Sequence, residues 1–190
     1  FLFAPGEPMQ AVFVRDSRRE AEVVTPAHRL PDRAVRWSRD GRIVAVARQG
    51  SIRVCDSGTG RVLHSIKTFA SGLEVAAWSV FENRLAADMG EGKFQLLDLP
   101  TGKILGGGDY NGDMLADLTF SPDGRKLAVR GRQGYTRIHD GLTGLPLTPL
   151  LQHAKGSPDH AFSPDSQLIA TAGGDGTIRM WNTDDGKPMG

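Results

Sequence analysis

The sequence comprises 190 residues, a length that favours one domain or slightly more. Its 23 basic and 22 acidic residues leave a net charge of +1, so no strong field would attract DNA, RNA or an anionic membrane. The single cysteine, Cys55, excludes an internal disulfide, and no apolar run reaches the length of a membrane span. We therefore expect no nucleic-acid partner, no membrane partner and a cytoplasmic protein. The chain begins with Phe1 rather than Met, as expected of a chain that lacks its true N-terminus.

The first 32 residues contain three short segments that are typical of strands. Phe1–Ala4, Val12–Asp16 and Ala21–Thr25 are apolar or β-branched runs separated by polar or turn-forming residues. They are expected to be the second, third and fourth strands of a unit, residues 1–32, that lacks its first strand.

The remainder of the chain divides into four units that can be superimposed on one another. Near its start each unit has an aromatic residue followed by serine or, in the second unit, the pair Trp78-Ser79; short apolar strands follow, and then a turn rich in Asp, Thr and Gly. The unit ranges are expected to be 33–68, 69–110, 111–152 and 153–190. The last range stops before a fourth strand, so it is expected to hold the first, second and third strands only.

The spacing between the four units is strict. Asp56, Asp98, Asp140 and Asn182 follow one another at intervals of 42 residues (56 to 98, 98 to 140 and 140 to 182), and Gly60, Gly102, Gly144 and Gly186 keep the same interval. A period of about 40–45 residues with four short strands per unit is typical of β-propeller blades. The predicted fold class is all-β: a β-propeller fragment of four-stranded antiparallel blades, three complete and two partial, all in one truncated propeller domain.

Turn and edge signals agree with this prediction. Ser121-Pro122-Asp123-Gly124 predicts a type I turn. Pro146, Pro149 and Pro188 fall in the last strand of a unit, and because proline cannot donate to a ladder that strand is expected to be an outer edge. Gly106–Gly108 lacks the helix and the Lys-Ser/Thr pair of a phosphate-binding loop, so we interpret it as a flexible connection between blades.

The last unit carries a family resemblance. Phe162-Ser163-Pro164-Asp165, followed by Gly174-Asp175-Gly176-Thr177-Ile178-Arg179-Met180-Trp181-Asn182, resembles a WD repeat with Asn182 in place of the final Asp. In that family a His, a strand Ser or Thr, the turn Asp and the Trp form a buried hydrogen-bonded tetrad. The resemblance implies that the tetrad of this chain is His153, Thr171, Asp175 and Trp181, and that its role is structural.

The other units keep less of the pattern. The Trp position holds Cys55, Leu97 or His139; the turn-Asp position holds Gln49, Glu91 or Gln133; and the His position holds His28, Phe69 or Asn111. Only the last unit is expected to close the full network.

Candidates for catalysis are few. His139 and His160 have no evident partnered nucleophile and base, so we interpret them as packed or buried histidines. Cys55 occupies a Trp position and is expected to be a small buried thiol. One cysteine and scattered histidines do not form a zinc-binding spacing. We therefore predict a protein that is not an enzyme and has no cofactor.

A weaker candidate is a calcium loop formed by Asp109, Asn111, Asp113 and Asp117. These residues place acidic or amide oxygens at alternate positions, as a calcium loop does. Met114 stands where the sharp-turn glycine belongs, and a polar loop between blades is the simpler interpretation.

Propellers that resemble this chain bind peptides or proteins on the face that bears the loops between blades and the turns between second and third strands. The residues predicted to contact a protein or peptide partner are Arg29, Arg33, Arg48, Asn111, Asp113, Arg132 and Lys155. Arg48 and Arg132 are the strongest candidates, because arginine is enriched at interfaces and pairs well with carboxylates; ordinary solvated surface is the competing interpretation.

The predicted function is a non-catalytic scaffold for protein–protein interaction within a larger multidomain protein. Further blades, or another chain, would complete the ring. A propeller enzyme or a sensor of small ligands or metals is the alternative, and a purely structural array is a third possibility.

Overall fold

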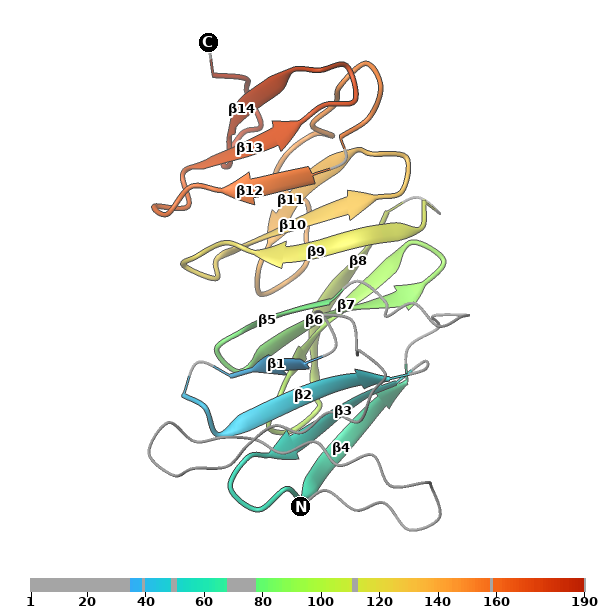
Figure 1. Ribbon diagram of the computed structural model, residues 1–190, viewed down its shortest axis with the longest axis vertical. Coiled ribbons are helices and arrows are strands. Elements are labelled where there is room, and N and C mark those ends of the chain that lie inside the picture. The colour runs from blue at the N-terminus through green and yellow to red at the C-terminus, as the bar shows by residue number, and fades with distance from the viewer. Residues whose placement is uncertain are drawn as a thin grey trace, which may run out of the picture.

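The computed structural model describes residues 35–38, 40–48, 51–67, 78–110, 113–157 and 159–189, so the partial unit expected at residues 1–32 lies outside the described residues. The described residues form antiparallel sheets that follow one another along the long axis of the molecule (Figure 1). Within these ranges no helix is long and apolar enough to cross a membrane.

Four sheets account for the strands. The first contains β1 (Val35–Trp37), β2 (Ile43–Arg48), β3 (Ser51–Asp56) and β4 (Val62–Lys67). The second contains β5 (Trp78–Phe81), β6 (Arg84–Gly90), β7 (Lys93–Asp98) and β8 (Ile104–Asp109). The third contains β9 (Leu115–Phe120), β10 (Lys126–Gly131) and β11 (Thr136–Asp140), and the fourth contains β12 (Asp159–Phe162), β13 (Leu168–Ala172) and β14 (Ile178–Asn182). The prediction of an all-β propeller fragment is confirmed, and the sheets, which resemble propeller blades, do not close into a ring.

The third sheet differs from the complete four-stranded unit predicted for it. Its fourth segment lies beside β11 but pairs only at two isolated bridges, His139 with Pro146 and Thr136 with Leu151. Pro146 and Pro149 have no N–H to donate, so a continuous ladder cannot form between these two bridges. Among the described residues, the four-stranded sheets are therefore the first and the second.

The 42-residue repeat marks the turn between the third and fourth segments of each unit. The carboxylate of Asp56 accepts the backbone N–H of Thr59 at 2.8 Å, and the carboxylate of Asp140 accepts that of Thr143 at 2.7 Å. These are Asx turns, in which the side chain takes the place of a backbone acceptor. The glycine that closes each turn has a positive φ, which glycine adopts without steric cost: Gly60 at 71°, Gly102 at 69°, Gly144 at 77° and Gly186 at 71°.

The interpretation of Gly106–Gly108 as a flexible connection is wrong. These residues lie in β8 and pair with β7. A Cβ on Gly106 would lie 2.2 Å from the carbonyl oxygen of Thr143, and a Cβ on Gly108 would lie 2.7 Å from the ring of Phe94. The glycines are therefore required because the turn of the third sheet packs directly on this strand.

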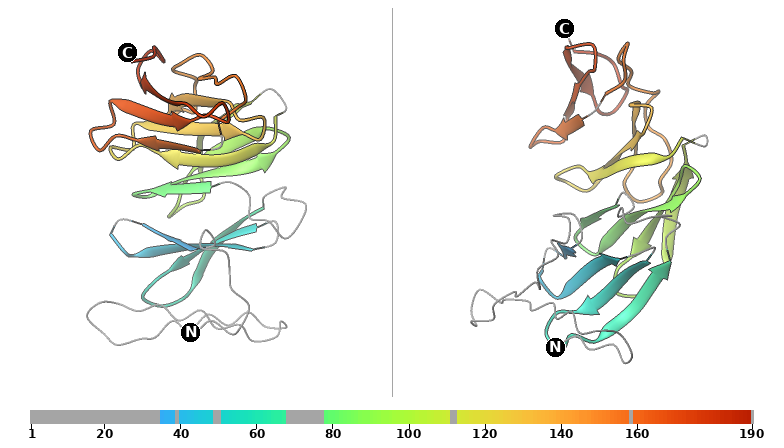
Figure 2. Two further views of the ribbon diagram at one scale, coloured as in Figure 1. Left: turned by 45° about the horizontal axis from the view of Figure 1, so that its top comes forward. Right: turned by 45° about the vertical axis from the view of Figure 1, so that its right-hand side comes forward.

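The hydrophobic core lies between the sheets. One cluster joins the first and second sheets through residues such as Val54 and Leu97, a second joins the second and third through Phe94 and Leu118, and a third joins the third and fourth through Ile138. The successive sheets are seen from two further directions in Figure 2. Because each sheet buries one face against its neighbour, stability is shared between adjacent units, as in other repeat proteins.

Two basic side chains clamp neighbouring sheets together. Arg84, at the start of β6, donates to the carbonyl oxygen of Gly141 at 2.6 Å, and its guanidinium lies 5.5 Å from the ring centroid of Phe120. Lys126, at the start of β10, donates to the hydroxyl of Thr183 at 2.5 Å. Each clamp therefore ties the second strand of one sheet to the turn of the next sheet.

Candidate functional site

The structure brings together the four residues that the resemblance singled out. The indole N–H of Trp181 donates to Oγ1 of Thr171 at 2.8 Å, and Nε2 of His153 lies 2.7 Å from the same oxygen. Nδ1 of His153 lies 3.3 Å from Oδ1 of Asp175. A neutral His153 that donates from Nδ1 to Asp175 and accepts the Thr171 hydroxyl at Nε2 satisfies every group in this chain of bonds.

Asp175 connects this network to the surrounding loops. Its Oδ1 accepts the hydroxyl of Thr177 at 2.6 Å and the backbone N–H of Thr177 at 3.0 Å, and its Oδ2 accepts the backbone N–H of Ala154 at 3.2 Å. Arg179 reaches the same carboxylate at 3.5 Å. The Thr177 hydroxyl is the main reason that the pKa of Asp175 is held well below its ordinary value, with the backbone N–H groups and His153 adding to the effect.

The order Thr171–His153–Asp175 has the outline of a nucleophile, base and acid triad, but its burial is that of a structural network. Thr171 is completely buried, and the side chain of His153 has no exposed surface. A nucleophile must reach its substrate, and the lone pair of this hydroxyl is already taken by the indole of Trp181. The network instead holds the loop that begins at His153 against the β13–β14 turn.

In the third sheet the same positions are filled differently. Val129 stands where the fourth sheet has Thr171, so a tryptophan in place of His139 would find no hydroxyl for its indole N–H. His139 instead has Nδ1 at 2.9 Å from the carbonyl oxygen of Gly144, and its ring meets Phe94 edge-on with 5.1 Å between centroids. His139 is thus a packed histidine, and burial lowers its pKa.

Several residues predicted to contact a partner lie at one end of the sheets. Lys155 is exposed on the loop 153–157, which is held between two turns: Ser157 N–H donates to the carbonyl oxygen of Gly134 at 2.6 Å, and Gly174 N–H donates to that of Gly156 at 2.9 Å. Arg132 is exposed in the β10–β11 turn beside Gly134. We call Arg132, Asp113 and Lys155 the loop face.

Other predicted contact residues are less accessible to description. Arg48 ends β2 at the corresponding place in the first sheet, and its side chain is not among the described ones. Arg29, Arg33 and Asn111 lie outside the described residues.

Two members of the loop face also have internal roles. The carboxylate of Asp113 accepts the backbone N–H of Gln133 at 3.3 Å, so it ties its own loop to the β10–β11 turn. Arg132 acts on Asp88 of the second sheet: burial raises the pKa of Asp88, while the N–H of Gly90 and the positive charge of Arg132 oppose that rise. The sequence analysis missed Asp88, which has no counterpart among the motifs of the other units.

The calcium candidate is divided between separate parts of the structure. Asp109 ends β8, Asp113 caps the β10–β11 turn, and Asp117 lies in β9 with Oδ2 at 3.9 Å from Nε2 of His160, while Asn111 is outside the described residues. In the part of the chain that the structure describes, no group of three or more His, Cys, Asp or Glu could hold a metal ion.

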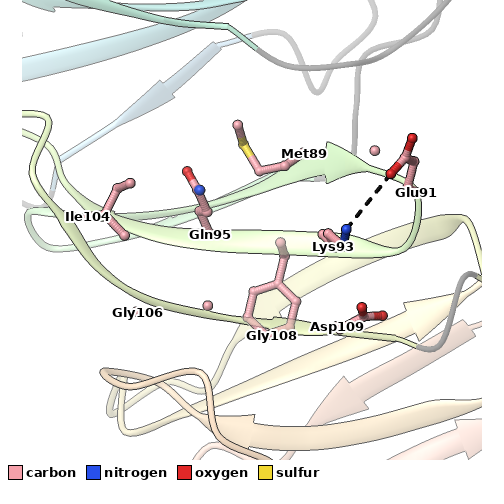
Figure 3. A pocket seen from close by; sticks show the side chains of 11 residues that line it. Met89, Glu91, Lys93, Gln95, Ile104, Gly106, Gly108 and Asp109 are labelled. Carbon is pink, nitrogen blue, oxygen red and sulfur yellow. Dashed lines mark ion pairs between the residues drawn. The ribbon is translucent and has the colours of Figure 1, made fainter.

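A groove of about 610 Å³ runs along the outer strands of the second sheet. Figure 3 shows Met89, Gln95 and Ile104 around it, with an ion pair between Lys93 and Glu91 at its rim. The backbone of Gly106–Gly108 forms one wall. Its charged groups, Glu91, Lys93 and Asp109, lie on the β7 and β8 edge and include no histidine, cysteine or hydroxyl nucleophile, so the groove has no constellation for catalysis.

Comparison with known proteins assigns the repeat. Residues 146–182, which contain the whole hydrogen-bonded network, match the family model described as WD domain, G-beta repeat. No curated protein matches the chain.

Solved structures show the same fold at low identity. The computationally designed Ika8 protein is 21% identical, with a TM-score of 0.65 over 82% of this chain and 47% of its own. The computationally designed Ika4 protein is 22% identical, with a TM-score of 0.65 over 82% of this chain and 93% of its own. A chain in the crystal structure of the Mitotic Checkpoint Complex is 23% identical, with a TM-score of 0.65 over 81% of this chain and 48% of its own. The chain thus spans about half the length of the first and third of these.

Antiparallel sheets of three or four strands, stacked as blades and not closed into a ring, define the chain as a propeller-type repeat protein. Within that class it is a WD40-repeat protein of the G-beta repeat family.

Proposed function

We propose that this chain is a non-catalytic scaffold that binds a protein or peptide through the loop face and the adjoining Arg48, as part of a larger multidomain protein. The observation that supports the proposal is the gathering of exposed Arg132 and Lys155 at one end, on turns that backbone hydrogen bonds hold in place. A rigid platform lowers the entropy that binding costs, and arginine pairs well with carboxylates. The expected partner is therefore a protein segment that carries acidic groups.

The remaining features of this proposal follow from the family and from the composition. Further blades or another chain would complete the array. A location in a reducing compartment, the cytoplasm, is compatible with the single Cys55, which is buried and free. The alternative of an enzyme or sensor propeller would need polar groups from several sheets to converge on an accessible site, whereas the most enzyme-like arrangement, around Thr171, is buried.

The proposal is tested by reversing charge on the loop face. Proteins captured from a lysate by the wild-type chain are identified, and the strongest is titrated against the purified chain. Arg132→Glu with Lys155→Glu, and separately Arg48→Glu, should weaken that binding at least about tenfold, since two lost charge pairs commonly exceed 1.4 kcal/mol.

The matched control is Arg125→Glu. Arg125 is also exposed, but it lies in the β9–β10 turn at the opposite end of the third sheet. Binding that is unchanged in the loop-face variants, or equally weakened by Arg125→Glu, would reject the loop face as the binding surface.

A further inference from the structure

The fourth sheet has an apolar face that no described residue covers. Phe162, Ile169 and Trp181 point toward the third sheet and join its core. Because side chains alternate along a strand, Leu168, Ala170, Ile178 and Met180 point the other way. Ile178 is 78% exposed and Met180 is 45% exposed. We call this the forward face of the fourth sheet, since it points in the direction in which each earlier sheet meets the next one along the chain.

The forward face of the fourth sheet repeats that of the first sheet position by position. In the first sheet Ile43 pairs with Asp56 and Ala45 with Val54; in the fourth, Leu168 pairs with Asn182 and Ala170 with Met180. One step further along the strands, Ile52 of the first sheet occupies the place of Ile178. The first-sheet residues are almost completely buried against Leu85, Ala87, Leu97 and Leu99 of the second sheet.

An alanine lies at the centre of every forward face. Ala45, Ala86, Ala128 and Ala170 occupy the same register position, opposite Val54, Leu96, Ile138 and Met180. The first three alanines are buried by the following sheet, with at most 1% of their surface exposed. A small side chain here lets the two sheets approach closely, so Ala170 has the residue type of a covered position.

The position of the basic clamp distinguishes two kinds of forward face. Arg84 and Lys126 occupy it in the second and third sheets, where they reach polar acceptors in the next turn. Ile43 and Leu168 occupy it in the first and fourth sheets. The forward face of the fourth sheet is therefore of the uncharged kind, which in this chain is matched by the leucine-rich rear of the second sheet.

We infer that the forward face of the fourth sheet is a docking surface for a further antiparallel sheet of the same repeat type, with a rear face like that of the second sheet. A head-to-tail second copy does not fit, because the rear face of its first sheet is already occupied: Val44 and Cys55 are each only 1% exposed. This inference deepens the proposal that further blades complete the array, by specifying the chemistry of the covering sheet, and it is independent of partner binding at the loop face.

The test supplies such a sheet. A copy of residues 68–110, which contains the second sheet, is appended after Gly190 of the full chain. The extended protein should unfold in a single urea transition at a higher midpoint than the 190-residue chain, and hydrogen exchange at the amides of β14 should slow. In the extended protein Ile178→Asp with Met180→Asp should remove both effects, as should aspartates in place of the appended copies of Leu85 and Leu97.

Leu145→Asp is the matched control, because Leu145 is 63% exposed but lies in a turn of the third sheet; it should leave the gain intact. An extension that yields no gain, or a gain that survives Ile178→Asp with Met180→Asp, would overturn the inference. So would sedimentation of the 190-residue chain as a dimer that Ile178→Asp converts to a monomer, because a second copy would then be the occupant. None of these readouts depends on capture of a partner.

Discussion

The Nδ1 atom of His139 lies 2.9 Å from the carbonyl oxygen of Gly144, so this nitrogen carries the proton of a neutral ring. The other ring nitrogen is buried and has no hydrogen-bond partner among the described residues. Protonation would therefore place a charge between Phe94 and Tyr110 without an acceptor.

This relationship predicts a loss of stability in mild acid. Burial lowers the pKa of His139 in the folded chain, so the unfolded chain binds the proton first. The stabilisation is fully present above the unfolded value of about 6.5 and is lost as the pH falls below it. His139→Phe should reduce the difference between the urea midpoints measured at about pH 7.5 and about pH 5.5. His64, whose pKa burial also lowers, is retained in both proteins, and equal pH dependence in the two would contradict the prediction.

Asp175 should contribute acid sensitivity at lower pH. Its pKa is depressed in the folded chain, chiefly by the Thr177 hydroxyl, so its stabilisation is present above the unfolded value of about 4 and is lost as the pH falls below that. Asp175→Asn should lower the melting temperature at neutral pH and flatten the melting temperature between about pH 4 and about pH 2. Asp175→Ala, which also removes the acceptors for Thr177 and Ala154, should lower the neutral melting temperature further. Parallel acid curves for wild type and Asp175→Asn would argue against this role.

The bond between Trp181 and Thr171 should show coupling. Trp181→Phe removes the indole donor and should cost about 1 kcal/mol, while Thr171→Val strands that donor and should cost about 1–3 kcal/mol. The double variant should cost less than the sum of the two, because removing both partners leaves no unsatisfied group. Urea unfolding of the four proteins measures the coupling energy, and strict additivity would show that the bond contributes nothing.

The clamp of Lys126 should contribute to stability more than a surface ion pair does. The side chain is 13% exposed and lies 2.7 Å from Asp184 as well as bonding Thr183, so Lys126→Met should cost about 1–2 kcal/mol. Lys187 also pairs with an aspartate, at 2.8 Å, but it is 80% exposed, and Lys187→Met should produce no measurable change. Equal midpoints for the two variants would mean that burial of the clamp has no effect.

Close packing at β8 predicts intolerance of a single methyl group. Gly106→Ala would place Cβ 2.2 Å from the backbone oxygen of Thr143, and the necessary shift should cost about 1–3 kcal/mol. Gly58→Ala is the control, because its nearest contact would be an ordinary 3.6 Å to Asp56. Thermal melts of both variants decide the matter: a Gly106→Ala protein as stable as Gly58→Ala would show that the two sheets do not approach as closely as described.

Local chemistry explains why the fold could be predicted. The Asp-x-x-Thr-Gly turns are formed by residues three or four positions apart, so their recurrence at 42-residue intervals is visible without knowledge of the fold. The network around Thr171 could be anticipated only through the WD-repeat resemblance, since its members are up to 28 residues apart in the chain (153 to 181). The clamps were not anticipated, although Arg84 and Lys126 share the 42-residue interval with their acceptors Gly141 and Thr183, because nothing in the spacing says that a side chain reaches into the next unit.

The sequence by itself determined the repeat, the strands and the turns of this protein, because alternation, turn residues and register act over a few neighbouring positions. Only the tertiary structure decided that Gly106–Gly108 is a strand, that Arg132 acts on Asp88, and that Ile178 and Met180 lie on an uncovered face. Each of these depends on what another sheet places against a residue, and that contact is set by packing between segments far apart in the chain.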